Sequence, residues 1–377
     1  MRWVLAPDSF KGSLSAQSVA QAMACGIRRA DETAHCDLLP MADGGEGTLD
    51  ALAAAVGGTW LHVPVHHAEG ELKSTAGLLL PDGTVVVEVA RIVGLPDVTD
   101  SPVWSRTSSG VGEMLAALLQ AGHRRLAVAL GGSCTNDGGV GCLAALGVRL
   151  LDAAGEPVAA LPARLAEIGQ VDISALDSRL AEAELEIWSD VTNPLTGPNG
   201  ATAVFGPQKG VPPEQLATLD AAIARFAELA DTAFGQPCRQ RAGSGAAGGL
   251  GYALQLLGGR PCPGAQAVAR HIGLAEALQM ADWVLTGEGR SDGQTLAGKA
   301  PLQVAAMARQ AGVPVSLLSG AVVPDGDGQL VRAFDGCFSL CNRPMTLSQA
   351  MNEAETRIAQ QAEQLARLVL ASSGRTR

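Results

Sequence analysis

Short apolar runs that stop at polar, glycine-rich loops recur near both ends of the chain. Residues 3–6 are apolar and stop at Pro7-Asp8-Ser9, and residues 283–285 are apolar and stop at a Thr-Gly pair. In each case apolar residues at helical spacing follow, over about 15–30 and 301–311. Strand, polar loop and helix in this order predict a parallel sheet with helices packed on its faces.

The same pattern predicts the other elements at the two ends of the chain. They are strands at about 36–39, 314–318 and 334–339, a helix that ends near 56, and a final helix over 348–371.

The middle of the chain departs from this rhythm. Residues 59–66 and 71–90 alternate apolar and polar positions, and a Pro-Asp-Gly turn lies at 81–83. These features predict antiparallel strands. Further strands are expected at about 125–130 and 185–188, with helices at about 109–121, 137–146, 213–231 and 247–257.

These elements predict an α/β fold with two domains, because a 377-residue chain exceeds the size at which one core usually stops growing. We expect a discontinuous domain from residues 1–58 and 281–377, with five parallel strands in a flavodoxin-like, doubly wound sheet. Residues 59–280 would form an inserted α/β domain with a mixed sheet. We expect the active site in the cleft between the two domains.

Composition excludes several classes of function. The net charge is -11 and aromatic residues make up 3% of the chain, which disfavours binding to nucleic acid. No apolar run reaches the length of a membrane span, and the N-terminus lacks a signal-peptide pattern. The eight cysteines form no C-x-x-C pair, which favours reduced thiols in a cytoplasmic protein over a metal site or disulfides.

Lysine is rare but recurs beside glycine. The chain has 23 arginines and four lysines, and three of the lysines lie next to glycines in polar loops: Lys11, Lys209 and Lys299. A lysine ammonium is a compact charge that suits phosphate. The pattern therefore favours phosphate binding, although an exposed glycine loop tolerates any charge.

Carboxylates gather at the predicted strand ends. They are Asp8, Asp43, Glu46, Asp137, Asp190, Glu288 and Asp292. A magnesium–nucleotide site needs one or two carboxylates, and a hydroxyl nucleophile needs a base. Seven exceed both needs, so several must be helix caps or turn residues.

Two glycine motifs and one Arg-Ser motif precede predicted helices. Asp43-Gly44-Gly45-Glu46-Gly47 and the stretch 137–141 both read D-G-G-x-G, which suits an anion at a helix start or an ordinary capped helix. Residues 106–110, with Arg106, Ser108 and Ser109, fit a pocket for a carboxylate or phosphate or a plain N-cap.

Three further matches are weaker. Residues 293–300 match a P-loop except that Ala300 replaces the hydroxyl residue, so we assign no P-loop there. Residues 243–248 match G-x-G-x-x-G without a preceding strand, which favours a glycine turn that packs against a helix. Residues 325–327 begin like a calcium loop but lack its later ligands.

Seven strings taken together resemble the type I bacterial glycerate kinases. In chain order they are APDSFKGSLSA (6–16), PMADGGEGT (40–48), ALGGSCTNDGG (129–139), SDVTNPLTGPNGA (189–201), FGPQKG (205–210), GSGAAGGLG (243–251) and LTGEGRSDGQTLAGKAP (285–301). The resemblance implies a two-domain α/β kinase that uses ATP and Mg²⁺ to phosphorylate glycerate, usually on the 2-hydroxyl. It also implies a place in glyoxylate, glycolate or sugar-acid breakdown.

Roles for individual residues are hypotheses at this point. The catalytic candidates are Asp190, Lys11, Asp43 and Glu288, with Asp43 and Asp190 as possible Mg²⁺ ligands. The candidates for binding substrate or phosphate are Asp8, Ser9, Gly44, Gly45, Glu46, Arg106, Ser108, Ser109, Asn136, Asp137, Asn193, Lys209, Arg290, Asp292 and Lys299. Among these, Arg106 with its serines, or Arg290, would hold the substrate carboxylate.

Several alternatives remain open. The chain could be a glycerate 3-kinase, a kinase of another small hydroxy acid, a phosphatase on the same scaffold, or a glycerate sensor without catalysis. We expect small-molecule partners, no membrane and no nucleic acid, and a monomer or homodimer. The pattern leaves open whether D- or L-glycerate is the acceptor.

Overall fold

The computed structural model describes residues 1–293, 299–323 and 327–372. The chain divides into two compact units. Unit 1 comprises Met1–Asp43, Gly47–Gly57 and Pro263–Arg377, and unit 2 comprises Gly44–Glu46 and Gly58–Cys262. Unit 2 is thus an almost continuous stretch of the chain, whereas unit 1 is formed from residues near both ends of the chain.

Unit 1 contains a sheet of five parallel strands in the order β15-β13-β11-β1-β2. The strands are β1 (Arg2–Leu5), β2 (His35–Leu38), β11 (Trp283–Thr286), β13 (Val315–Ser319) and β15 (Gly336–Ser339). Counted along unit 1 alone, this order is 2-1-3-4-5, the flavodoxin-like arrangement. The predicted fold class is confirmed, and the topological switch point lies between β1 and β11.

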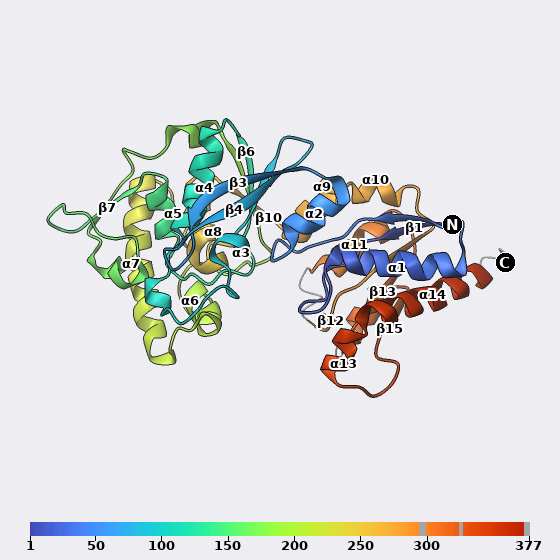
Figure 1. Ribbon diagram of the computed structural model, residues 1–377. Coiled ribbons are helices and arrows are strands. Elements are labelled where there is room, and N and C mark those ends of the chain that lie inside the picture. The colour runs from blue at the N-terminus through green and yellow to red at the C-terminus, as the bar shows by residue number, and fades with distance from the viewer. Residues whose placement is uncertain (294–298, 324–326, 373–377) are drawn as a thin grey trace. The chain divides into compact units, whose positions relative to one another are not determined.

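The longest helices of unit 1 are α1 (Ala16–Ala30) and α14 (Ala354–Ser372), which lie side by side (Figure 1). On α1, Val19, Met23 and Ile27 are fully buried, as their helical spacing predicts. They share a core with residues of β1, β11 and α14. The remaining elements of unit 1 are α2 (Thr48–Val56), α9 (Gly264–His271), α10 (Leu274–Leu278), α11 (Ala300–Gln310), α12 (Gln329–Arg332), β12 (Arg290–Ser291) and β14 (Ala321–Val322).

The predicted final helix is in fact two helices. Helix α13 (Leu347–Asn352) ends at Glu353, and α14 begins directly after it. Thr346 and Gln349 form a capping box at the start of α13, because each side chain accepts a hydrogen bond from the other residue's backbone N–H. The apolar spacing carries no sign of the break, which lies at a residue of ordinary helix propensity.

Unit 2 contains a six-stranded mixed sheet in the order β10-β9-β6-β5-β4-β3. The strands are β3 (Thr59–His66), β4 (Leu72–Leu79), β5 (Val85–Glu88), β6 (Arg125–Ala129), β9 (Glu184–Trp188) and β10 (Arg260–Cys262). Strand β4 pairs antiparallel with both β3 and β5, and the remaining pairs are parallel. The prediction of antiparallel strands around the turn at 81–83 is confirmed.

The four predicted helices of unit 2 are present with shifted ends, as α4 (Ser109–Gln120), α5 (Val140–Ala145), α7 (Leu216–Phe234) and α8 (Leu250–Leu256). Two short helices, α3 (Ala90–Val93) and α6 (Ala201–Phe205), were not predicted. Helix α5 begins later than predicted because Gly138 and Gly139 have positive φ angles of 69° and 75°. The small sheet of β7 (Arg149–Leu151) and β8 (Gln170–Asp172) was not predicted, because three-residue strands carry too little pattern.

The two glycine-rich stretches of unit 2 pack against each other. A side chain on Gly139 would lie 2.7 Å from the carbonyl oxygen of Gly249, and one on Gly249 would lie 2.4 Å from Gly138 Cα. Only glycine permits backbones this close. Within the G-x-G-x-x-G stretch itself, a side chain on Gly248 would lie 2.0 Å from Thr135 O, so the stretch is a packing turn, as expected. Among the described residues, no helix combines the length and apolarity needed to cross a bilayer.

Candidate functional site

The loops that follow β1 and β11 form one edge of the unit 1 sheet at its switch point. Backbone hydrogen bonds tie them together, from Ala6 N to Leu285 O at 2.9 Å and from Asp8 N to Gly287 O at 2.8 Å. Ligands of open α/β sheets bind at such an edge. The edge therefore places Asp8 beside the Gly287–Arg290 segment.

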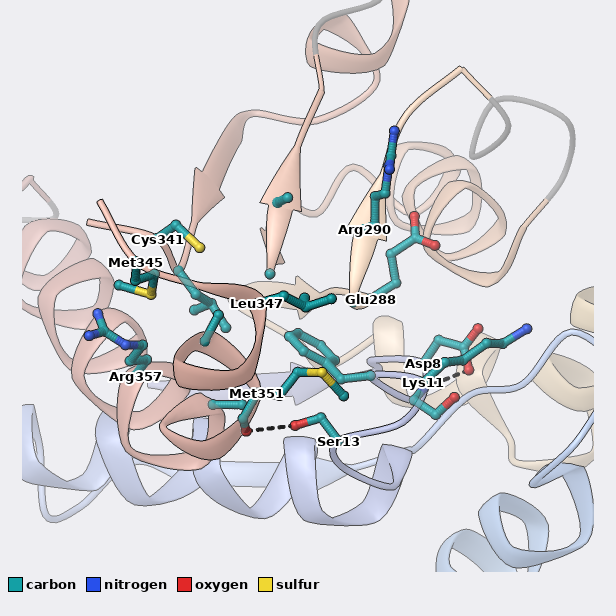
Figure 2. Close-up of a pocket in the computed structure, with 18 of the residues that line it drawn as sticks. Asp8, Lys11, Ser13, Glu288, Arg290, Cys341, Met345, Leu347, Met351 and Arg357 are labelled. Carbon is teal, nitrogen blue, oxygen red and sulfur yellow. Dashed lines mark hydrogen bonds between the residues drawn. The ribbon is translucent and has the colours of Figure 1, made fainter. Parts of the chain in front are cut away.

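The loop after β1 folds back on itself and presents Lys11. Phe10 and Leu14 exchange two backbone hydrogen bonds, and Gly12 adopts a left-handed φ of 76° at the turn. Ser13 Oγ donates a 2.9 Å hydrogen bond to Met351 O on α13 (Figure 2). This contact joins the loop after β1 to α13.

Glu288 is buried and held by its neighbours. Ser291 Oγ donates to Glu288 Oε1 at 2.9 Å, and Lys299 Nζ lies 3.5 Å from Glu288 Oε2. A side chain on Gly287 would lie 2.0 Å from Leu318 O, so this loop packs directly on β13. Gly287 therefore serves close backbone packing, which brings the neighbouring carboxylate to the sheet edge.

A cavity of about 560 Å³ opens at this edge of unit 1. Several predicted site residues line it together: Asp8, Ser9, Lys11, Asp43, Glu288, Arg290 and Lys299. Figure 2 shows Asp8, Lys11, Glu288 and Arg290 on one side of the cavity. Asp292 does not line the cavity, and its carboxylate pairs with Arg290 at 3.1 Å.

The electrostatics at Asp8 differ from those of an ordinary aspartate. Asp8 is 7% exposed, and its carboxylate accepts a 2.6 Å hydrogen bond from Ser9 N. Burial, followed by the negative charge of Asp43, raises the pKa of Asp8 to about 7. A carboxyl group of this kind exchanges a proton near neutral pH.

The oxygen donors of this cavity suit Mg²⁺ bound to a nucleotide. Magnesium prefers hard oxygen ligands and takes one or two carboxylates together with phosphate oxygens. Asp8, Asp43 and Glu288 supply such carboxylates within one cavity. In the described part of the chain, no cluster of three or more His, Cys, Asp or Glu side chains is arranged to hold a metal ion by itself.

In unit 2, Asp137 has a structural environment. Its carboxylate accepts hydrogen bonds from Ser108 N at 2.8 Å, Ser108 Oγ at 2.7 Å, Gly139 N at 2.9 Å and Gly141 N at 3.3 Å. Burial has the larger effect and raises the pKa of Asp137, while the four hydrogen bonds act in the opposite direction. Ser108 immediately precedes α4, but its hydroxyl bonds to Asp137 and does not cap that helix.

Arg106 and Lys209 are both buried, and the Arg106 side chain contacts the backbone of Lys209. Arg106 Nη1 donates to Lys209 O at 2.8 Å, and Arg106 also donates to Ser101. Lys209 Nζ donates to Ser133 Oγ at 3.0 Å and to Thr135 O at 2.8 Å. Burial lowers the pKa of Lys209 to about 8. Both cations therefore hold loops of unit 2 together.

The remaining predicted residues of unit 2 lie on loops, except for Ser109. Asp190 is the second residue after β9, and Asn193 Nδ2 donates to Asn199 O at 2.9 Å in the same loop. Asn136 is fully buried, and its Nδ2 donates to Thr202 Oγ1 at 3.0 Å. Three residues belong to the short Gly44–Glu46 segment, where Gly44 O accepts a bond from Gly131 N at 2.9 Å. Ser109 is the first residue of α4, and its N–H donates to Thr107 Oγ1.

Two of the weaker sequence matches fall partly outside the described residues. The near-P-loop stretch 293–300 includes residues 294–298, and the calcium-loop stretch 325–327 includes residues 325 and 326. Lys299, at the end of the first stretch, is the residue before α11.

Sequence reasoning missed the apolar wall of the cavity. Its residues are Phe10, Leu340, Met345, Leu347, Ala350, Met351 and Ala354. All except Phe10 come from the segment after β15, which carries no glycine-rich motif. The one available signal was the apolar pair Met345 and Leu347 between polar residues.

Comparison with known proteins gives one consistent result. The profile described as "Glycerate kinase family" matches residues 3–370. A glycerate kinase from Haemophilus influenzae is 40% identical over 98% of this chain and 99% of its own. A glycerate 2-kinase from Escherichia coli K12 is 37% identical over 97% of both chains. A crystal structure from Salmonella typhimurium LT2, assigned as a glycerate kinase 2, has a TM-score of 0.88, with 39% identity over 99% of each chain.

Proposed function

Because this chain belongs to the glycerate kinase family, we propose that it transfers the γ-phosphoryl group of Mg-ATP to the 2-hydroxyl of D-glycerate, giving 2-phosphoglycerate and ADP. The observation that carries this proposal is the cavity of unit 1, which combines Asp8, Asp43 and Glu288 with Lys11 and Lys299. Phosphoryl transfer needs cations that bind the phosphates. It also needs carboxylates, which bind a metal ion or accept a proton.

In the proposed reaction, the glycerate oxygen attacks the γ-phosphorus and the bond from that phosphorus to the bridging oxygen of ADP breaks. The hydroxyl proton passes to a carboxylate. Asp8 suits this role, because its pKa of about 7 lets it accept a proton near neutral pH. Lys11 and Lys299 would neutralise phosphate oxygens. Mg²⁺, when bound, would neutralise further charge on the phosphates.

Two residues of unit 2 keep their predicted roles in this proposal. Asp190 is a candidate catalytic residue or Mg²⁺ ligand, and Asn193 is a candidate for substrate binding. Arg290 on unit 1 remains the better candidate than Arg106 for the glycerate carboxylate. The reason is that Arg290 lines the cavity, whereas the Arg106 guanidinium bonds to loops of its own unit.

The cellular setting is proposed from the family. We propose a cytoplasmic enzyme of glyoxylate, glycolate or sugar-acid catabolism, monomeric or homodimeric. None of the eight cysteines forms a disulfide, which agrees with a reducing compartment.

The test is ADP formation from Mg-ATP with D-glycerate, with the product identified by ³¹P NMR. A 2-phosphoglycerate signal supports the proposal, and a 3-phosphoglycerate signal keeps the kinase and overturns the position. Turnover with L-glycerate or another hydroxy acid alone would reassign the acceptor. Nucleotide and glycerate binding without turnover would point to a sensor.

The substitution Lys299→Met tests whether the Lys299 ammonium contributes to the reaction. It removes a cation beside Glu288, so we expect a large loss of kcat/KM for ATP. Lys73→Met is the matched control, because Lys73 is exposed and pairs with Glu71 on unit 2. Equal effects of both substitutions would contradict the role of Lys299.

A further inference from the structure

One wall of the unit 1 cavity is apolar and is not used by the phosphoryl chemistry. The segment after β15 and helix α13 contribute Leu340, Met345, Leu347 and Met351, and the loop after β1 contributes Phe10. Figure 2 shows Cys341, Met345 and Arg357 across the cavity from Asp8, Lys11 and Glu288, with Leu347 and Met351 between. The cavity therefore has one side with several charged groups and one largely apolar side, which also carries Arg357.

The apolar side exposes surface that a ligand would cover. Leu347 is 76% exposed, the highest fraction among the large apolar side chains that the structure describes. An apolar side chain at the rim of a cavity gains free energy when a ligand removes it from water. Exposure of this kind at a cavity is a feature of binding sites.

The wall is held rigidly. The capping box of Thr346 and Gln349 fixes the start of α13. Arg357, which is 8% exposed, donates from Nη1 to Asn342 Oδ1 at 2.7 Å and from Nη2 to Glu353. Ser13 Oγ bonds to Met351 O from the opposite loop. A preformed wall loses little entropy when a ligand binds.

We propose that this wall binds the nucleoside part of ATP, with the base against Met345, Leu347 and Met351 and the phosphates directed to Lys11 and Lys299. This assignment rests on the proposed function, because it requires a nucleotide substrate. A planar base and a ribose present the apolar faces that match such a wall, and a phosphate chain matches the opposite side.

The acceptor fits this wall poorly. Every carbon of glycerate carries oxygen, so the molecule has no apolar surface with which to cover Leu347 or Met351. Placing its carboxylate against these side chains would desolvate a charge on an apolar surface, and Arg357, which also lines this side, already donates to Asn342 and Glu353. The volume of the cavity, about 560 Å³, also lies in the range of sites for drug-sized ligands rather than three-carbon acids.

The test substitutes Ala350, a half-buried residue that lines the apolar side. The Ala350→Phe side chain would occupy the space of the base. We expect the Kd of ADP, measured by isothermal titration calorimetry, to rise about tenfold or more, and the Kd of tripolyphosphate to stay unchanged. Ser348→Phe is the matched control, because Ser348 lies exposed on the same helix and does not line the cavity.

Leu347→Ala covers the case in which the larger substitution disturbs folding. Leu347 is exposed, so its truncation leaves the core intact, and we expect ADP affinity to fall about threefold or more. Illumination with 8-azido-ATP should label the segment 340–354 in the unaltered protein. Unchanged ADP affinity in Ala350→Phe and Leu347→Ala, or labelling elsewhere, would overturn the assignment.

Failure of the assignment and failure of the proposed function give different results. If unaltered protein binds ADP but transfers no phosphate to any hydroxy acid, the proposed function fails. The calorimetric test still decides whether the apolar wall binds the nucleoside. If the protein phosphorylates glycerate and Ala350→Phe raises only the KM of glycerate, the kinase stands and the wall belongs to the acceptor.

Discussion

At the scale of single residues, the same sequence feature leads to two kinds of carboxylate. Asp8 and Asp137 both follow apolar runs and precede glycine-rich turns, but their surroundings differ. Asp137 accepts four hydrogen bonds within unit 2, whereas Asp8 lines a cavity beside Asp43. Hydrogen-bond partners and burial decide which carboxylate is structural, and neither is visible from spacing along the chain.

Asp8→Asn should change how stability depends on pH. The pKa of Asp8 is about 7 in the folded protein and 3.8 as its ordinary value, so between these values the folded state binds more protons than the unfolded state. Stability therefore falls as the pH rises through that window, and the cost is fully present above pH 7. In EDTA without nucleotide, we expect Asp8→Asn to raise Tm at pH 8 by about 2 °C or more, with the gap closing toward pH 4.

The control for this pH profile is Asp50→Asn, since Asp50 is exposed on α2. Its Tm at pH 4 and pH 8, relative to that of the unaltered protein, measures the effect of removing an exposed carboxylate. A gap for Asp8→Asn that stays constant from pH 4 to pH 8 would mean that Asp8 does not titrate in this window.

Asp190→Ala tests the proposed catalytic contribution of unit 2. If Asp190 binds Mg²⁺ or accepts a proton, kcat should fall about 10²- to 10⁴-fold while the far-UV circular dichroism and Tm stay close to normal. Asp177→Ala is the comparison, because Asp177 caps a short helix of the same unit and pairs with Arg179. Near-normal turnover of Asp190→Ala would remove it from the reaction.

At the scale of elements, close packing of backbone explains glycines that the sequence presents as motif residues. Gly26 on α1 faces α14, and a side chain there would lie 2.0 Å from Ala359 O. Gly287 and Gly320 are similarly close to backbone on neighbouring strands and loops. These contacts set the distance between helices and sheet, and thereby hold the loops that carry Asp8 and Glu288.

Gly26→Ala should destabilise the protein even though alanine is the better helix former. Helix propensity alone would favour alanine by about 1 kcal/mol. The clash with Ala359 O outweighs this gain, because inserting a methyl group into a packed contact costs about 1–3 kcal/mol or more. Urea unfolding measures the net effect. Gln21→Ala, at an exposed position of α1, should be neutral or stabilising, and equal stability of Gly26→Ala would contradict the tight contact.

At the scale of the whole molecule, the two units draw on different parts of the chain. The buried core of unit 1 uses residues 3–34 together with residues 285–369, so it needs both ends of the chain. The two cores of unit 2 use residues between 61 and 257. The predicted domain boundaries at 58 and 280, and the predicted position of the active site between domains, stay predictions.

Residues 58–262 should therefore fold when expressed alone, and residues 1–57 should not. We expect the first fragment to unfold cooperatively in urea and to protect its core amides from hydrogen exchange, because its cores are complete. Residues 1–57 lack β11 and α14, against which β1 and α1 pack. A molten or aggregated 58–262 fragment, in a buffer that keeps the full chain native, would contradict this independence.

The amino-acid sequence was sufficient to predict most of the longer strands and helices, the polar loops between them, the flavodoxin-like class and the family. Those features depend on periodicity, on turn residues and on strings of adjacent residues, all of which are local. The three-dimensional structure was needed to show that Asp8, Asp43 and Glu288 share a cavity, that Asp137 and Lys209 are bonded within their own unit, and that the segment after β15 forms an apolar wall. Burial and hydrogen-bond partners arise when segments far apart in the chain meet, and these contacts give each side chain its charge state and its chemistry.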